Sequence, residues 1–173
     1  SWLNENINTI NTNILKYTEE NPESTGMGTT VVLALLTKDF LLFGNIGDSS
    51  GFVFKNKKLH KITKDHTLVN LLVETGEIAP EEALNHPKKN VLMKALGTET
   101  KQVLDTFDVD TDVDAIMLCS DGLTNMLTIE QIEKVLNDNE LIIEEKLIKI
   151  IKKCNARGGT DNISIAYLVK DGE

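Results

Sequence analysis

Residues 115–123 read AIMLCSDGL and decide the fold, because an unbroken apolar run ends in Ser120-Asp121-Gly122. Residues 158–169 reverse this order, since GGTDN comes before the apolar run ISIAYLV. Both apolar runs predict buried strands. If the two strands pair antiparallel, the end of the first lies beside the start of the second, and Asp121 and Asp161 meet at one edge of a sheet. Two carboxylates held there form a hard oxygen-ligand site suited to Mg²⁺ or Mn²⁺.

The composition describes a globular domain with an acidic surface. The chain has 173 residues, of which 40% are hydrophobic, so it is long enough to bury a core. Lys and Arg number 18 against 27 Asp and Glu, which gives a net charge of −9 and argues against nucleic acid as a partner. Two unmatched cysteines, no signal peptide and no apolar run near the roughly 20 residues of a membrane helix predict a cytoplasmic protein without a membrane partner.

The rest of the pattern mixes hairpins with helices. Alternating and apolar runs predict hairpins over 29–46 and 51–62, the second turning at Asn56-Lys57, and strands over 102–109, 115–119 and 162–169. Helical spacing predicts helices over 2–20, 67–75, 80–85, 128–137 and 140–154, with an irregular insert over 86–100. Hairpins exclude a purely parallel sheet. We therefore expect an α+β fold, a sandwich of antiparallel sheets flanked by helices.

A third acidic loop follows another apolar run. Gly47-Asp48-Ser49-Ser50-Gly51 comes directly after the strand predicted over 40–46. Taken alone, this loop is most simply a β-turn, and the same interpretation applies to the loops at Asp121 and Asp161. Because all three loops abut a buried strand, together they favour a shared metal-binding edge.

Read in order, these segments resemble one protein family. The motifs are GMGTT at 26–30, GNIGDS at 44–49, LCSDGL at 118–123 and GGTDNIS at 158–164, with TKDHT at 63–67, His86-Pro87 and ALG at 95–97 between them. They are similar to those of the metal-dependent protein phosphatases, the PPM or type 2C serine/threonine phosphatases, in their small bacterial form. The resemblance covers the chain from residue 26 onward and is specific because no single motif carries it.

The resemblance implies a fold and an activity. It implies a single catalytic domain over residues 1–173 with a four-layer α-β-β-α sandwich, and a flap subdomain at about 63–100 that influences substrate access. It implies hydrolysis of phosphoserine and phosphothreonine on proteins by metal-activated water, with two or three Mn²⁺ or Mg²⁺ ions in the complete enzyme. The implied partners are phosphorylated proteins and a cognate Ser/Thr kinase with its targets.

The resemblance also implies roles for particular residues. Asp121 and Asp161 fall on metal-ligand aspartates of the family, and Asp48 falls on an acid that helps to hold an additional metal. Asn162, Gly122 and Ser120 would support these ligands. Metal ions at such a site neutralise the phosphate and supply the attacking water. No residue of the chain is assigned as a catalytic acid, base or nucleophile.

The chain departs from the family pattern in its first residues. The motif Asp-Gly-Met-Gly-Gly, whose aspartate bridges both catalytic metals, has no counterpart, because Thr25 precedes Gly26-Met27-Gly28. The family's phosphate-binding Arg and its His general acid are not matched either. We therefore expect the C-terminal portion of a catalytic domain, with N-terminal strands absent, open sheet edges and no activity of its own. The alternative is a non-catalytic metal-binding or interaction module with a degenerate phosphatase fold.

Other candidate sites are weaker. Residues 108–114 mimic a calcium loop, but positions six and twelve are Val113 and Cys119 where Gly and Glu are needed, so a solvated acidic turn is expected. The three histidines, His60, His66 and His86, show no metal-ligand spacing, and His66 is expected to cap the helix that begins near Thr67.

Overall fold

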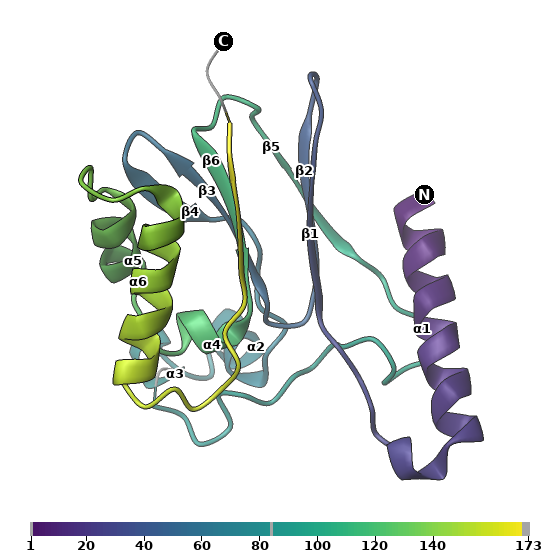
Figure 1. The fold of residues 1–173 in the computed structure, drawn as a ribbon. Coiled ribbons are helices and arrows are strands. Elements are labelled where there is room, and N and C mark those ends of the chain that lie inside the picture. The colour runs from purple at the N-terminus through teal and green to yellow at the C-terminus, as the bar shows by residue number, and fades with distance from the viewer. Residues whose placement is uncertain (1, 84, 171–173) are drawn as a thin grey trace. The chain divides into compact units, whose positions relative to one another are not determined.

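The apolar runs that end at Cys119 and Val169 lie in one four-stranded antiparallel sheet in the computed structural model, which describes residues 2–83 and 85–170 (Figure 1). Its order is β4-β3-β6-β7, from β3 (Ser50–Lys55), β4 (Lys58–Lys61), β6 (Ala115–Cys119) and β7 (Ile165–Val169). Strand β6 pairs antiparallel with β7, and Cys119 lies opposite Ile165. The predicted pairing of the two apolar runs is confirmed.

A second sheet has the order β1-β2-β5, from β1 (Val31–Leu36), β2 (Leu41–Ile46) and β5 (Asp105–Val109). Leu41 and Phe43 of β2 share a buried cluster with Val53 of β3 and Ile116 of β6, so side chains of the two sheets pack against each other. Two antiparallel sheets with helices confirm the expected α+β class.

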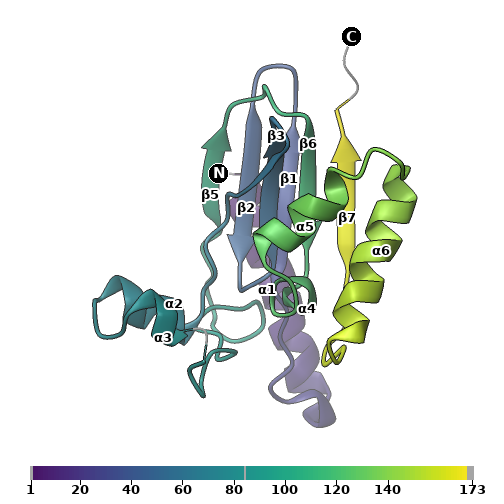
Figure 2. The same cartoon turned by 90° about the vertical axis from the view of Figure 1, so that its left-hand side faces the viewer.

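Three helices pack on the four-stranded sheet: α4 (Asp121–Thr124), α5 (Ile129–Leu136) and α6 (Ile143–Ala156). Helices α5 and α6 cover one face of this sheet (Figure 2). The apolar residues of α6 recur at helical spacing, and Ile150 and Cys154 are fully buried. They join Phe52 and Met117 of the sheet in the larger core cluster.

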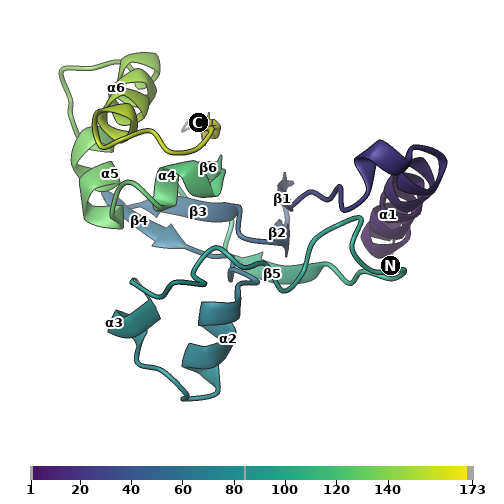
Figure 3. The same ribbon diagram turned by 90° about the horizontal axis from the view of Figure 1, so that it is seen from below.

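The chain divides into two compact units, and the sheets and helices just described form most of the second unit, within 32–43, 49–63 and 107–173. The first unit comprises 1–31, 44–48 and 64–106. It contains α1 (Trp2–Glu20), the 3₁₀ helix η1 (Pro22–Ser24), α2 (Leu68–Glu74) and α3 (Pro80–Ala83). Helices α2 and α3 lie side by side (Figure 3). The unit boundaries cross β1, β2 and β5, and the expected single domain stays a prediction.

Polar side chains hold α1 within the first unit. Asn4, Asn8 and Asn11 lie on one face of the helix and bond the backbone of the segment from Gly97 to Leu104. Asn11 is fully buried and both donates to Glu99 O and accepts from Gly97 N. This segment joins the end of the insert predicted over 86–100 to the start of the strand predicted over 102–109, and side-chain bonds rather than a sheet order it, because β5 begins only at Asp105.

Three local expectations were wrong. Asp121 does not stand in a loop, because it is the first residue of α4. The last strand begins at Ile165 rather than 162. Thr67, not His66, caps α2, since its side chain accepts from Asn70 N. None of the helices within the described residues is long and apolar enough to span a membrane.

Candidate metal site

Asp121 and Asp161 are brought together by the pairing of β6 with β7 in the second unit. Ser120, the residue after β6, makes three hydrogen bonds to the segment that leads into β7. Its amide donates to Ser164 O at 3.1 Å, its hydroxyl accepts from Ser164 N at 3.0 Å, and the hydroxyl donates to Asn162 O at 3.2 Å. These bonds continue the pairing beyond the strands and fix the loop that carries Asp161.

Gly122 allows the two acidic segments to approach closely. A Cβ atom at this position would lie 2.3 Å from Asn162 O, which is a backbone atom. The backbone N–H of Asn162 in turn donates a hydrogen bond to Asp161 Oδ1 at 2.7 Å. Glycine is therefore required at position 122 for Asp161 to lie where it does beside Asp121.

The electrostatics of the pair favour a bound cation. Partial burial raises the pKa of the Asp121 carboxyl, and the nearby charge of Asp161 raises it further, although hydrogen bonds from Gly122 N and from the Asn125 amide lower it. Two like charges at close range are costly unless a proton or a cation is shared. The donor set consists of hard carboxylate oxygens, so it fits a divalent ion such as Mg²⁺ or Mn²⁺.

The protein supplies two carboxylates at this site. Among residues 2–83 and 85–170, no three His, Cys, Asp or Glu side chains are grouped to hold a metal ion. Two carboxylates are nevertheless sufficient for Mg²⁺, which usually keeps several water ligands and binds through one or two carboxylates together with substrate phosphate.

Asp48 belongs to the first unit, where it follows a tightly held turn. Gly47 has a φ of +103°, and its carbonyl accepts from the fully buried Asn45 side chain at 3.1 Å. The Asn45 amide also donates to Lys64 O at 2.9 Å, while its Oδ1 has no hydrogen-bond partner in the described part of the chain. Asp48 stands after a buried strand as the sequence predicts, and its assignment as a ligand stays a prediction.

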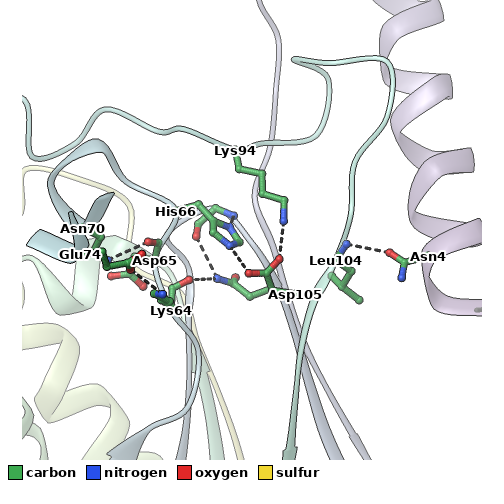
Figure 4. Close-up of polar contacts among 11 residues, drawn as sticks. Asn4, Lys64, Asp65, His66, Asn70, Glu74, Lys94, Leu104 and Asp105 are labelled. Atoms are coloured by element: carbon green, nitrogen blue, oxygen red, sulfur yellow. Dashed lines mark hydrogen bonds and ion pairs between the residues drawn. The ribbon is translucent and has the colours of Figure 1, made fainter. Parts of the chain in front are cut away.

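Sequence reasoning missed a polar network in the first unit. His66 Nε2 lies 3.0 Å from Asp105 Oδ2, and Lys94 Nζ donates to Asp105 Oδ1 at 2.7 Å (Figure 4). These residues line a cleft of about 460 Å³ together with Leu71, Met93 and Val103. The motif TKDHT contains His66, but nothing local in the sequence points to Asp105, which is 39 residues away.

Comparison with known proteins gives a consistent result. The family model for protein phosphatase 2C matches residues 2–153. The serine/threonine phosphatase stp of Listeria monocytogenes is 41% identical over 172 residues, which cover 99% of this chain and 68% of that protein. The protein phosphatase PhpP of Streptococcus pneumoniae is 32% identical over 149 residues, 86% of this chain and 60% of that protein.

Solved structures show the same relationship. The crystal structure of Stp1 from Staphylococcus aureus aligns with a TM-score of 0.93 and 35% identity, over 99% of this chain and 67% of that chain. The catalytic domain of PstP, in complex with two manganese ions, aligns with a TM-score of 0.80 and 33% identity, over 98% of this chain and 70% of that chain. The chain belongs to the protein phosphatase 2C family and is a serine/threonine protein phosphatase.

Proposed function

We propose that Asp121 and Asp161 are ligands of the divalent ions on which this phosphatase depends for the hydrolysis of phosphoserine and phosphothreonine. The observation that carries the proposal is the antiparallel pairing of β6 with β7, which places the charge of Asp161 close enough to raise the pKa of Asp121. The manganese ions in the related PstP catalytic domain support the choice of metal. We infer two or three ions, Mn²⁺ or Mg²⁺, with Asp48 contributing to an additional one.

A bound divalent ion would neutralise phosphate oxygens and lower the pKa of the attacking water. The residues of the chain hold the ligands in place. Hydrogen bonds of Ser120 fix the loop of Asp161, and the missing side chain of Gly122 lets the backbone of Asn162 pack against α4. Asn125 Nδ2 donates to Asp121 Oδ2 at 3.1 Å. This hydrogen bond, together with the one from Gly122 N, orients the carboxylate of Asp121. Ligands fixed in this way cost little reorganisation when the phosphate arrives.

The substrates are phosphorylated proteins, and we propose a cognate Ser/Thr kinase that acts on the same targets. We also propose one catalytic domain over residues 1–173, in which residues 63 to about 100 form the flap that influences substrate access. The free thiols of Cys119 and Cys154 are both buried, which suits a cytoplasmic, reducing location.

Replacing Asp161 by Asn tests the metal assignment. Changing even the partners of metal ligands commonly costs about 10–100-fold in metal affinity, so removing a ligand charge is expected to weaken Mn²⁺ binding at least about tenfold. The protein expressed from its complete gene is titrated with Mn²⁺ by calorimetry, and phosphothreonine-peptide hydrolysis is measured at limiting Mn²⁺. Both affinity and turnover are expected to fall, and excess Mn²⁺ is expected to restore part of the turnover.

Asp108→Asn is the matched control. It makes the same chemical change at an exposed position of β5, so it is expected to leave Mn²⁺ affinity and turnover unchanged. Wild-type Mn²⁺ affinity and turnover in Asp161→Asn would contradict the assignment of Asp161 as a ligand.

A further inference from the structure

His66 holds the turn before Asp48 from two sides. Its backbone amide donates to Gly47 O at 2.9 Å, and its ring Nδ1 accepts from Gly47 N at 2.9 Å. Both polar groups of the Gly47 backbone are therefore bound by one residue, and Gly47 O is bound by Asn45 as well. The peptide that leads into Asp48 is fixed by contacts from outside the turn.

Such contacts are needed because glycine cannot fix the turn alone. Gly47 lies at a φ of +103°, which glycine adopts freely and other residues rarely adopt. A Cβ atom there would lie 2.3 Å from Thr30 Cγ2, so the position excludes a stiffer residue. The residue before Asp48 is thus flexible by nature, and its conformation depends on its hydrogen bonds.

The bond from Gly47 also fixes the tautomer of His66. An amide N–H can only donate, so Nδ1 must offer its lone pair and the ring hydrogen must be on Nε2. Nε2 faces Asp105 Oδ2 at 3.0 Å, where a carboxylate accepts that hydrogen. Asp105 therefore stabilises the Nε2–H tautomer of His66, which is the tautomer that can accept the hydrogen bond from Gly47 N.

Asp105 is held as a carboxylate by its neighbours. Partial burial would raise its pKa, but hydrogen bonds from Lys94 and His66 outweigh this effect and lower it. Lys94 Nζ donates to Asp105 Oδ1 at 2.7 Å, while the other carboxylate oxygen, Oδ2, faces His66 Nε2 (Figure 4). The His66 side chain is only 14% exposed, so water competes weakly for its ring nitrogens.

We propose that Lys94 and Asp105 are positioning residues, which keep His66 in the Nε2–H tautomer and thereby set the direction of the Asp48 carboxylate toward a divalent ion. The inference rests on the proposed role of Asp48 as a metal ligand. The chain of contacts runs from Lys94 through Asp105 and His66 to Gly47, and every member lies in the first unit.

The tautomer is tested first, in the metal-free protein expressed from its complete gene. Long-range ¹H–¹⁵N correlation spectra of the histidine rings are expected to show a single Nε2–H tautomer for His66. In Asp105→Ala the ring nitrogens of His66 are expected to shift toward an averaged, exchanging pattern. A wild-type spectrum with the hydrogen on Nδ1, or a pattern unchanged by Asp105→Ala, would overturn the proposal.

Metal binding is tested next, by electron paramagnetic resonance of free Mn²⁺. The Mn²⁺ affinity that Asp48→Asn loses relative to the wild type is the part of Mn²⁺ binding that depends on Asp48. Asp105→Ala and Lys94→Met are expected to weaken that same component about tenfold, as changes beyond the ligands commonly do. Asp105→Asn keeps one acceptor oxygen where the carboxylate has two, so its Mn²⁺ affinity is expected to lie between those of the wild type and Asp105→Ala.

A matched control separates positioning from general stability. Asp112→Ala removes an ion pair to Lys55 of 2.8 Å in the second unit and is expected to leave Mn²⁺ binding unchanged. If Asp48→Asn weakens binding while Asp105→Ala and Lys94→Met do not, positioning is refuted and the ligand role of Asp48 stands. If Asp48→Asn itself has no effect, the ligand role of Asp48 fails. Should Asp105→Ala not fold, Lys94→Met decides by the same comparison.

Discussion

Gly122 has a functional consequence although it carries no side chain. It is a buried residue of α4 that faces the loop of Asp161, and a Cβ atom added there would lie 2.3 Å from Asn162 O. The close approach of the segments that carry Asp121 and Asp161 therefore depends on the absence of a side chain at Gly122. Changing this residue can alter the geometry of the site while leaving both carboxylates in the chain.

Gly122→Ala is expected to weaken Mn²⁺ binding several-fold and to lower the free energy of unfolding by about 1–3 kcal/mol, the usual range for an overpacked site. The added methyl must push Asn162, and with it Asp161, away from Asp121. Calorimetric Mn²⁺ titration and urea denaturation measure the two effects. Gly76→Ala serves as the control, since a Cβ atom there meets nothing within 4 Å and only the positive φ is strained. Equal Mn²⁺ affinity in both variants would contradict this account of Gly122.

At the scale of elements, Gln131 connects the start of α5 to the end of α6. Its Oε1 accepts from Thr128 N at 3.1 Å, as part of the capping box of α5, and also from Arg157 Nη1 at 2.8 Å. Arg157 is the C-cap of α6 and donates to Met126 O at 2.7 Å. The single arginine of the chain is thus bound to the backbone and side chains of its own unit, four residues before Asp161.

Gln131→Ala is expected to lower the free energy of unfolding by about 2 kcal/mol, because it removes one neutral and one charge-assisted hydrogen bond. The midpoint of urea denaturation measures the loss. Lys134→Ala is the control, because Lys134 is exposed on the same helix and, within the described residues, its side chain makes no hydrogen bond or ion pair. This variant is expected to change the free energy of unfolding by less than about 0.5 kcal/mol. A loss in Gln131→Ala no larger than in Lys134→Ala would show that Gln131 does not join the two helices.

For the molecule as a whole, the acidic balance and the proposed metal site together predict that stability depends on divalent ions. The net charge is −9, and Asp121 and Asp161 repel each other in the folded state. The unfolded chain does not hold the two carboxylates together, so a divalent ion bound by both, as proposed, would favour the folded state. Binding to the folded state alone raises its stability by mass action.

Mn²⁺ is therefore expected to raise the melting temperature, and a stabilisation of about 2.7 kcal/mol corresponds to free Mn²⁺ at a hundred times its dissociation constant. In the protein expressed from its complete gene, removal of the ion by a chelator is expected to reverse the rise and to abolish phosphatase activity. The double variant Asp121→Asn with Asp161→Asn is expected to melt no earlier than the metal-free wild type and to lose most of the response to Mn²⁺. An undiminished response in the double variant would place the stabilising ion elsewhere.

The sequence by itself determined the strands, most helices and the positions of the acids, because these depend on local apolar patterns and on turn residues. The hairpin at Asn56-Lys57 is an example, since both residues adopt the positive φ that the turn needs. The same local reasoning missed α4, whose single turn is too short to produce a periodic pattern.

Only the tertiary structure decided which residues meet. The register of β6 on β7, with Cys119 opposite Ile165, brings Asp121 to Asp161 across about forty residues of chain. The contact of His66 with Asp105 likewise joins residues 39 apart. The sequence predicts the first contact only on the condition that the two strands pair antiparallel, and it gives no local signal for the second. Each contact depends on how distant segments pack and on the hydrogen bonds that this packing allows.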